Sequence, residues 1–214
     1  MENFKEIAKI LYQGDSGQLE SLIRDELDKG INAREILNKG LIKGMEEIGK
    51  DFKANILYMP EVLLSARAMN KCLAILKPYL AEGEVKPKGK IVIGTVEGDL
   101  HDIGKNLVAI MWEGAGFEVI DIGIDVPAHK FVQAVQEHKP DILGLSALLT
   151  LTLPGIRNVI EALEAAGIRD SVKVMAGGAP VTEKYAISAG ADGYAEDAVT
   201  AVEEAERLLG LVAD

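Results

Sequence analysis

The stretch KIVIGTVEGDLHDIGKNLV (residues 90–108) decides the fold of the second part of the chain. Its apolar start, KIVI, predicts a buried strand, and the residues from Asp102 onward predict a helix. Between them lies the turn GTVEGDLHDIG (94–104), which contains three glycines, three acidic residues and a histidine. The start of a helix needs one capping side chain, so this turn carries more polar groups than its place in the chain requires.

The same alternation of apolar run and helix pattern continues from this stretch to the C-terminus. Apolar runs predict strands at 90–95, 117–123, 141–146, 172–178 and 191–195. Amphipathic patterns predict helices at 102–116, 127–139, 154–168, 181–190 and 197–212. This order predicts an α/β fold with a doubly wound parallel sheet and right-handed crossovers, Rossmann-like or flavodoxin-like in type.

The residues before this region show helix patterns only. They predict four helices, at 3–13, 14–30, 32–52 and 59–80, and four helices with short turns predict a small antiparallel bundle. The polar segment 81–90, with one proline and three lysines, predicts a linker. We therefore predict two domains, a helical bundle at residues 1–87 and an α/β domain at residues 88–214.

Composition narrows the choice of partners. The 214 residues carry a formal net charge of −11, whereas nucleic acids and anionic membrane surfaces bind clustered Lys and Arg. The longest apolar segment, 142–153, is shorter than the ~20 residues of a membrane-spanning helix, and the N-terminus has no signal-peptide pattern. The single cysteine, Cys72, provides neither an internal disulfide nor a cysteine-based metal cluster. These observations predict a cytoplasmic protein without a nucleic-acid or membrane partner.

Ligands of doubly wound sheets bind at the carboxyl ends of the strands. The residues there are mostly glycines and small hydroxyl residues, namely Gly104, Ser146, Leu148, Thr150, Thr152, Gly177 and Gly178. Because glycine lets the backbone approach a bound group closely, we predict a slot for a long and mostly neutral group. The first turn lacks both the GxGxxG spacing and the Walker lysine, so nicotinamide cofactors and nucleoside triphosphates are not expected.

His101 and Asp99 are the candidate site in the first turn. A loop histidine is commonly just solvated, but a histidine that binds a metal usually gives its other ring N–H to a carboxylate. Asp99 stands two residues before His101, and Thr152 is placed to extend that chain of hydrogen bonds. With no second nitrogen or sulfur ligand nearby, the pattern favours a single axial ligand to a metal already held by a macrocycle.

Three motifs in this order resemble those of cobalamin-binding domains. Asp99-Leu-His101-Asp-Ile-Gly104 matches their D-x-H-x-x-G motif, Ser146-Ala-Leu148 matches S-x-L, and Gly177-Gly178 matches their double glycine. The segment MPEVLLSARAM (59–69) resembles the last helix of the bundle that precedes the B12 domain in methionine synthase and in small corrinoid proteins. Over nearly its whole length the chain resembles the stand-alone corrinoid proteins of methanol, methylamine, glycine betaine and methoxyarene methyl-transfer systems.

The resemblance implies a role for each of these residues. Cobalamin, or a related corrinoid, would bind with its own lower base detached and with His101 as the lower ligand of cobalt. Asp99 and Thr152 would complete the hydrogen-bonded relay; methionine synthase has serine in place of Thr152, and threonine keeps the hydroxyl. The detached tail would lie in the slot. The bundle would cover the upper face of the corrin with Tyr58, Met59 and Leu63, whose alternative place is the core of the bundle.

The resemblance also implies a function. The protein would carry a methyl group from a substrate-specific methyltransferase to a second, methyl-acceptor methyltransferase, with a reductive activase as a further partner. It would be a subunit of a methyltransferase system and not a complete enzyme, and no catalytic residue is assigned to it. Three alternatives remain open: a cobalamin-binding sensor or storage module, a mutase subunit, and a flavodoxin-like domain without a corrin. In the last of these, Asp99 and Asp102 are only turn and cap residues.

Overall fold

A computed structural model describes residues 2–79 and 87–211 of the chain. The chain divides into two compact units, which are described separately: Met1–Lys86 with Gly114–Gly116, and Pro87–Glu113 with Phe117–Asp214. Residues 81–86 of the predicted linker lie outside the described residues, and the predicted domain boundary between residues 87 and 88 stays a prediction. In the described ranges no helix is both long and apolar enough to cross a lipid bilayer.

The first unit is helical. Its elements are α1 (Glu2–Gln13), α2 (Ser16–Asp28), α3 (Ala33–Glu35), the π-helical segment η1 (Ile36–Ile42), α4 (Lys43–Lys53), α5 (Met59–Leu76) and the 3-10 turn η2 (Lys77–Tyr79). The carboxylate of Asp15 caps α2 by accepting a hydrogen bond from the Gln18 amide at 3.0 Å. Large aliphatic side chains from α1, α2, η1, α4 and α5 form the core, including Leu11, Ile23, Leu41, Ile48 and Met69.

The pattern at 32–52 predicted one α-helix, and the structure widens its first half into the π-helical turn η1. Gly40 in η1 and Gly44 in α4 allow these two elements to lie close to α1. A Cβ atom at Gly40 would lie 2.8 Å from Cγ2 of Ile7, and one at Gly44 would lie 3.1 Å from Cα of Ala8. The spacing of apolar residues thus located the helix but not its local change of hydrogen-bond pattern.

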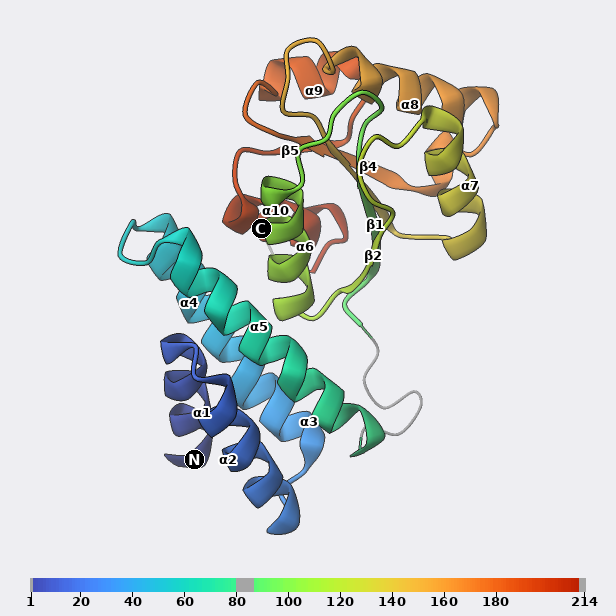
Figure 1. Cartoon of the computed structure of the whole chain (residues 1–214). Coiled ribbons are helices and arrows are strands. Elements are labelled where there is room, and N and C mark those ends of the chain that lie inside the picture. The colour runs from blue at the N-terminus through green and yellow to red at the C-terminus, as the bar shows by residue number, and fades with distance from the viewer. Residues whose placement is uncertain (1, 80–86, 212–214) are drawn as a thin grey trace. The chain divides into compact units, whose positions relative to one another are not determined.

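The second unit is a five-stranded, all-parallel sheet with helices on both faces (Figure 1). The strands are β1 (Lys90–Thr95), β2 (Glu118–Asp121), β3 (Ile142–Ser146), β4 (Lys173–Gly177) and β5 (Gly193–Ala195), in the spatial order β2-β1-β3-β4-β5. The helices are α6 (Ile103–Gly114), α7 (Ala128–His138), α8 (Pro154–Ala165), α9 (Glu183–Ala189) and α10 (Ala198–Leu208), with the 3-10 turn η3 (Arg169–Ser171) before β4. This is the flavodoxin-like order, and the predicted fold class is confirmed.

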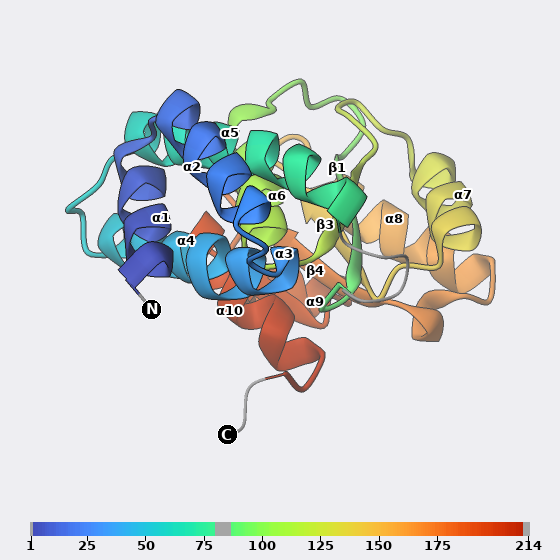
Figure 2. The ribbon, with the colours of Figure 1, turned by 90° about the horizontal axis from the view of Figure 1, so that it is seen from below.

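The helices divide between the two faces of the sheet because the chain changes direction after β2. It runs from β1 to β2 one way and from β2 through β3 to β5 the other way, so right-handed crossovers place α6 opposite α7, α8 and α9. Figure 2 shows α7 and α8 on the side of the sheet away from α6. On the α6 side, the buried indole of Trp112 donates a hydrogen bond to the carbonyl oxygen of Ala201 in α10 at 2.9 Å.

Strand register brings the ends of the three central strands level. Thr95 at the end of β1 pairs with Ser146 at the end of β3, and Ser146 pairs in turn with Gly177 at the end of β4. The point where the strand order reverses lies between β1 and β3, and that is where ligands of such sheets bind. The turns after these strands therefore meet at one edge of the sheet.

Candidate functional site

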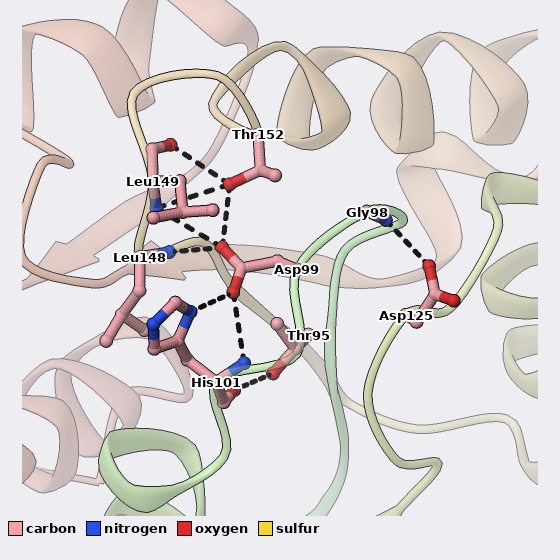
Figure 3. A network of polar contacts seen from close by, with 8 residues as sticks. All are labelled: Thr95, Gly98, Asp99, His101, Asp125, Leu148, Leu149 and Thr152. Carbon is pink, nitrogen blue, oxygen red and sulfur yellow. Dashed lines mark hydrogen bonds and ion pairs between the residues drawn. The ribbon is translucent and has the colours of Figure 1, made fainter.

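The turns after β1 and β3 meet on the carboxylate of Asp99 (Figure 3). One oxygen, Oδ1, accepts the His101 amide at 3.1 Å and lies 2.7 Å from Nδ1 of the same residue's ring. The other oxygen, Oδ2, accepts the Leu148 amide at 2.7 Å, the Leu149 amide at 3.2 Å and the Thr152 hydroxyl at 2.7 Å. Asp99 thus joins two turns that are about 50 residues apart in the sequence.

Asp99 is fully buried, with none of its surface exposed. Burial by itself raises the pKa of a carboxyl group. The hydrogen bonds that Asp99 accepts from Thr152, Leu148 and His101 outweigh the burial, so the pKa of Asp99 lies well below its usual value. The site therefore holds a fixed negative charge that only accepts hydrogen bonds.

This charge determines how the His101 ring presents itself. Because a carboxylate only accepts, Nδ1 must carry the proton in the Asp99–His101 bond, and in the neutral ring the lone pair lies on Nε2. The side chain of His101 is 50% exposed. The buried hydroxyl of Thr95 donates to the His101 carbonyl oxygen at 3.0 Å and fixes the backbone below the ring. An oriented, accessible imidazole nitrogen suits one axial ligand of a cofactor that brings its own metal.

The predicted slot residues lie at the ends of β3 and β4 and at the start of α6. Ser146 is buried, Leu148 is half-buried, and a Cβ atom at Gly104 would meet nothing within 4 Å. Gly178 has φ +125°, and a Cβ atom there would overlap the carbonyl oxygen of Ala147. A side chain at position 178 would therefore distort the loop, whereas one at Gly104 would project into open space. Whether these residues line a cofactor slot stays a prediction.

The remaining predicted residues lie on the surface of their own units. Thr150 is exposed in the turn that carries Leu148 and Thr152. In the helical unit the exposed fractions are 63% for Tyr58, 37% for Met59 and 36% for Leu63. The alternative that places these three in the core of the bundle is therefore wrong, while their role above a corrin stays a prediction.

Sequence reasoning missed the partners that Asp99 finds in the backbone. The amides of Leu148 and Leu149 leave no trace in the residue types, because every residue except proline has such a donor. The Thr95 hydroxyl was visible as a polar residue at the end of an apolar strand, but its contact with the His101 carbonyl depends on the path of the turn. Asp125 was likewise visible as a polar residue just after the second strand. Its carboxylate accepts a hydrogen bond from the Gly98 amide in the turn that carries Asp99.

Comparisons with known proteins agree with the geometry. A family model described as a B12 binding domain matches residues 89–203, and a second model with the same description matches residues 4–77. The dimethylamine corrinoid protein 1 of Methanosarcina acetivorans is 51% identical over 180 residues, 84% of each chain. A corrinoid protein of Desulfitobacterium hafniense (strain Y51) is 42% identical over 213 residues, 98% of this chain and 99% of its own.

A solved structure agrees over the full length. The methanol:cobalamin methyltransferase complex of Methanosarcina barkeri contains a chain that superposes with a TM-score of 0.89 at 29% identity, covering 100% of this chain and 81% of that one. These matches confirm the resemblance to corrinoid proteins and the corrinoid cofactor that the sequence predicted. The chain belongs to the family of B12-binding corrinoid proteins.

Proposed function

We propose that this protein is the methyl-carrying corrinoid subunit of a methylamine methyltransferase system. The single observation that carries the proposal is His101, exposed at the switch point of the sheet and oriented through Nδ1 by the buried carboxylate of Asp99. The dimethylamine corrinoid protein of Methanosarcina acetivorans named above supports the substrate class. When bound, a corrinoid supplies a cobalt atom that accepts and releases a methyl group.

The residues of this chain hold and orient the His101 ring. Asp99 keeps the proton on Nδ1 of His101, so that Nε2 would be free to hold the cobalt of a bound corrinoid. The Leu148 amide and the Thr152 hydroxyl hold Asp99 in place, at 2.7 Å each. This support raises the basicity of the ligand and limits the rotation of its ring.

The slot residues would receive the detached tail of the cofactor. Gly177 and Gly178 carry no side chain at the end of β4, and Ser146 at the end of β3 pairs with Gly177. Small residues at three strand ends suit a long group that enters along the sheet edge.

The chain would work with partner proteins. Corrinoid proteins of this kind associate with methyltransferases, and the solved methanol:cobalamin methyltransferase complex is an example. For this chain we infer a methylamine-specific methyltransferase as the donor partner, a second methyltransferase as the acceptor partner, and a reductive activase. The cytoplasmic location inferred from the sequence stays a prediction, which cell fractionation tests.

The lower ligand is tested by electron paramagnetic resonance of the protein loaded with cob(II)alamin. The spectrum should show hyperfine splitting from one axial nitrogen, and His101→Ala should remove it. His129→Ala, which changes an exposed histidine in α7, is the matched control and should leave the splitting intact. Splitting that persists in His101→Ala would assign the nitrogen to another group.

The carrier role is tested by reconstitution. The reduced, cobalamin-loaded protein is mixed with purified dimethylamine, trimethylamine or methanol methyltransferases and their substrates, and methylation is followed by absorbance. We expect turnover with a methylamine enzyme. Transfer with the methanol enzyme alone would overturn the substrate class, and tight cobalamin binding without any transfer would favour the sensor or storage alternative.

A further inference from the structure

The loop between β2 and α7 lies against the turn that carries Asp99 and His101. Asp125 is the residue of this loop that reaches the turn with both its side chain and its backbone. Its Oδ1 accepts a hydrogen bond from the Gly98 amide at 2.7 Å, and its own amide donates to the Asp99 carbonyl oxygen at 3.0 Å. Asp125 therefore holds the chain on both sides of the Gly98–Asp99 peptide. Figure 3 shows the first of these bonds, from the Gly98 amide to the carboxylate of Asp125.

The backbone of Asp125 is in the left-handed region, with φ +53°. Residues with a Cβ atom rarely adopt this conformation, and glycine adopts it without steric cost. Conformation alone would therefore favour glycine at position 125, as at Gly123 two residues earlier, where φ is +94°. The carboxylate provides what glycine lacks, an acceptor for the Gly98 amide.

The carboxylate is not needed to attach the loop to the sheet. Three backbone hydrogen bonds do that: the Ile122 amide to the Ile93 carbonyl at 2.9 Å, Thr95 to Gly123 at 3.0 Å, and Val126 to Thr95 at 3.0 Å. All three remain when the side chain of Asp125 is removed. The Gly98–Oδ1 bond thus adds a constraint on the turn itself, beyond the pairing of the loop with β1.

We propose that Asp125 is a positioning residue for the cobalt ligand: by fixing the peptide that bears Asp99, it sets the position from which Asp99 orients the ring of His101. The inference rests on the proposed function, in which His101 is the lower ligand. Asp125 does not contact His101; it acts through Gly98 and Asp99. The relay then has three supports for one carboxylate, from the turns after β1 and β3 and from the loop after β2.

Two substitutions separate the side-chain bond from the backbone conformation. Asp125→Gly removes the acceptor and relieves the positive φ, so the fold should not lose stability. Asp125→Asn keeps an oxygen acceptor on a residue that also tolerates this region. We expect the affinity for cob(II)alamin to fall about threefold to tenfold in Asp125→Gly, below the roughly 10- to 100-fold that follows loss of a group bonded directly to a metal-binding histidine. In Asp125→Asn the affinity should stay within about twofold of the parent protein.

The decisive readouts are spectroscopic. In the cob(II)alamin-loaded proteins, Asp125→Gly should show a mixture of signals with and without axial-nitrogen splitting, while Asp125→Asn shows the splitting of the parent. In the cofactor-free proteins, hydrogen exchange at the Gly98 amide should accelerate in Asp125→Gly only. A purely structural role would instead lower the unfolding temperature and leave the splitting of the folded, loaded protein unchanged.

The other possible outcomes also test the positioning role of Asp125. Full splitting and unchanged affinity in Asp125→Gly would overturn the positioning role. Equal losses in both variants would show that the charge acts and the acceptor does not, which also overturns it. If the parent protein shows no nitrogen splitting, the proposed function fails, and exchange at the Gly98 amide still tests whether the Asp125 side chain constrains the turn.

Discussion

The two oxygens of the Asp99 carboxylate serve different parts of the molecule. Oδ1 contacts the amide and ring of His101, two residues along the same turn, and Oδ2 contacts the turn after β3. A displacement of either turn therefore changes the direction of the imidazole. The orientation of one side chain depends on the relative position of two neighbouring strands.

The hydroxyl of Thr152 is expected to matter more than its methyl group. Thr152→Val has the same shape but leaves Oδ2 of Asp99 without the 2.7 Å bond, so local stability at β1 and β3 should fall by about 1–2 kcal/mol. Thr152→Ser keeps the hydroxyl and should lose less than half as much. Native-state hydrogen exchange of the strand amides measures both. Equal effects of the two substitutions would mean that packing, and not the hydrogen bond, holds this residue.

At this scale the sequence predicted the side chains of the relay and missed its backbone partners. Asp99, His101 and Thr152 were expected to form one chain of hydrogen bonds, and the structure brings them together in that order. Their residue types and their places after two neighbouring strands carried that information. The contacts of the Leu148 amide with Asp99 and of Asp125 with Gly98 were not predictable, because both depend on the exact path of a turn.

Helix α6 begins inside the candidate site, at Ile103, and Gly104 lies in its first turn. Gly104→Ala places a methyl group in open space and improves the helix, so the α/β unit should become more stable by about 0.5–1 kcal/mol. If Gly104 lines the slot, the same methyl group should weaken cobalamin binding severalfold. Urea unfolding and a cobalamin titration are the two measurements. A variant that is more stable and binds equally well would remove Gly104 from the slot.

Helices α1 and α2 are joined through Glu26, a buried carboxylate that accepts hydrogen bonds from Lys29 at 2.8 Å and from Asn3 at 2.5 Å. These bonds lower the pKa of Glu26 in spite of its burial. A lowered folded-state pKa stabilises the fold above the unfolded value, about 4.3, and the contribution is lost as the pH falls through the folded value. The stability difference between the parent and Glu26→Gln should therefore be largest near neutral pH.

Urea unfolding of both proteins, followed by circular dichroism between about pH 7 and pH 3, measures this difference. The gap should narrow below about pH 4 as the carboxylate takes up its proton. Glu35→Gln is a suitable control, since Glu35 forms an exposed pair with Lys39 and should have little effect at any pH. A gap for Glu26→Gln that stays constant with pH would show that its hydrogen bonds do not depend on its charge.

Elements were more predictable than their details. The five strands lie within the ranges that the apolar runs indicated, and the helices between them lie within the ranges that the amphipathic patterns indicated. The π-helical turn at Ile36–Ile42 was not evident, and the sequence left open whether Met59 and Leu63 are exposed or buried. In α5 the buried side chains include Val62, Met69 and Cys72, whereas Met59 and Leu63 are exposed.

For the whole molecule, the relay and the slot residues all lie in the α/β unit, at 95–104 and 146–178. A fragment of residues 88–214 is therefore expected to fold and to bind cobalamin with the nitrogen splitting of the full chain. Its affinity should be lower, because the resemblance assigns contacts with the upper face to Tyr58, Met59 and Leu63. Calorimetric titration of both proteins measures the loss.

Two results would contradict this prediction. Failure of the fragment to fold would show that the boundary at residues 87 and 88 is misplaced. Equal affinity of fragment and full chain would mean that the helical unit adds nothing to cobalamin binding. Tyr58→Ala in the full chain is the matched test of the upper-face contacts, since Tyr58 is exposed and its loss should leave the bundle intact.

Trp112 is the single tryptophan of the sequence, and it lies nine residues after the start of α6, about 14 Å along the helix axis from Ile103. Its emission therefore comes from one place, close to the residues proposed to bind the corrinoid. Corrinoids absorb across the near ultraviolet and the visible, so a bound cofactor would accept the excitation energy of the indole and quench its fluorescence. The fluorescence of Trp112 should therefore report how much of the protein has bound a corrinoid, without an added label.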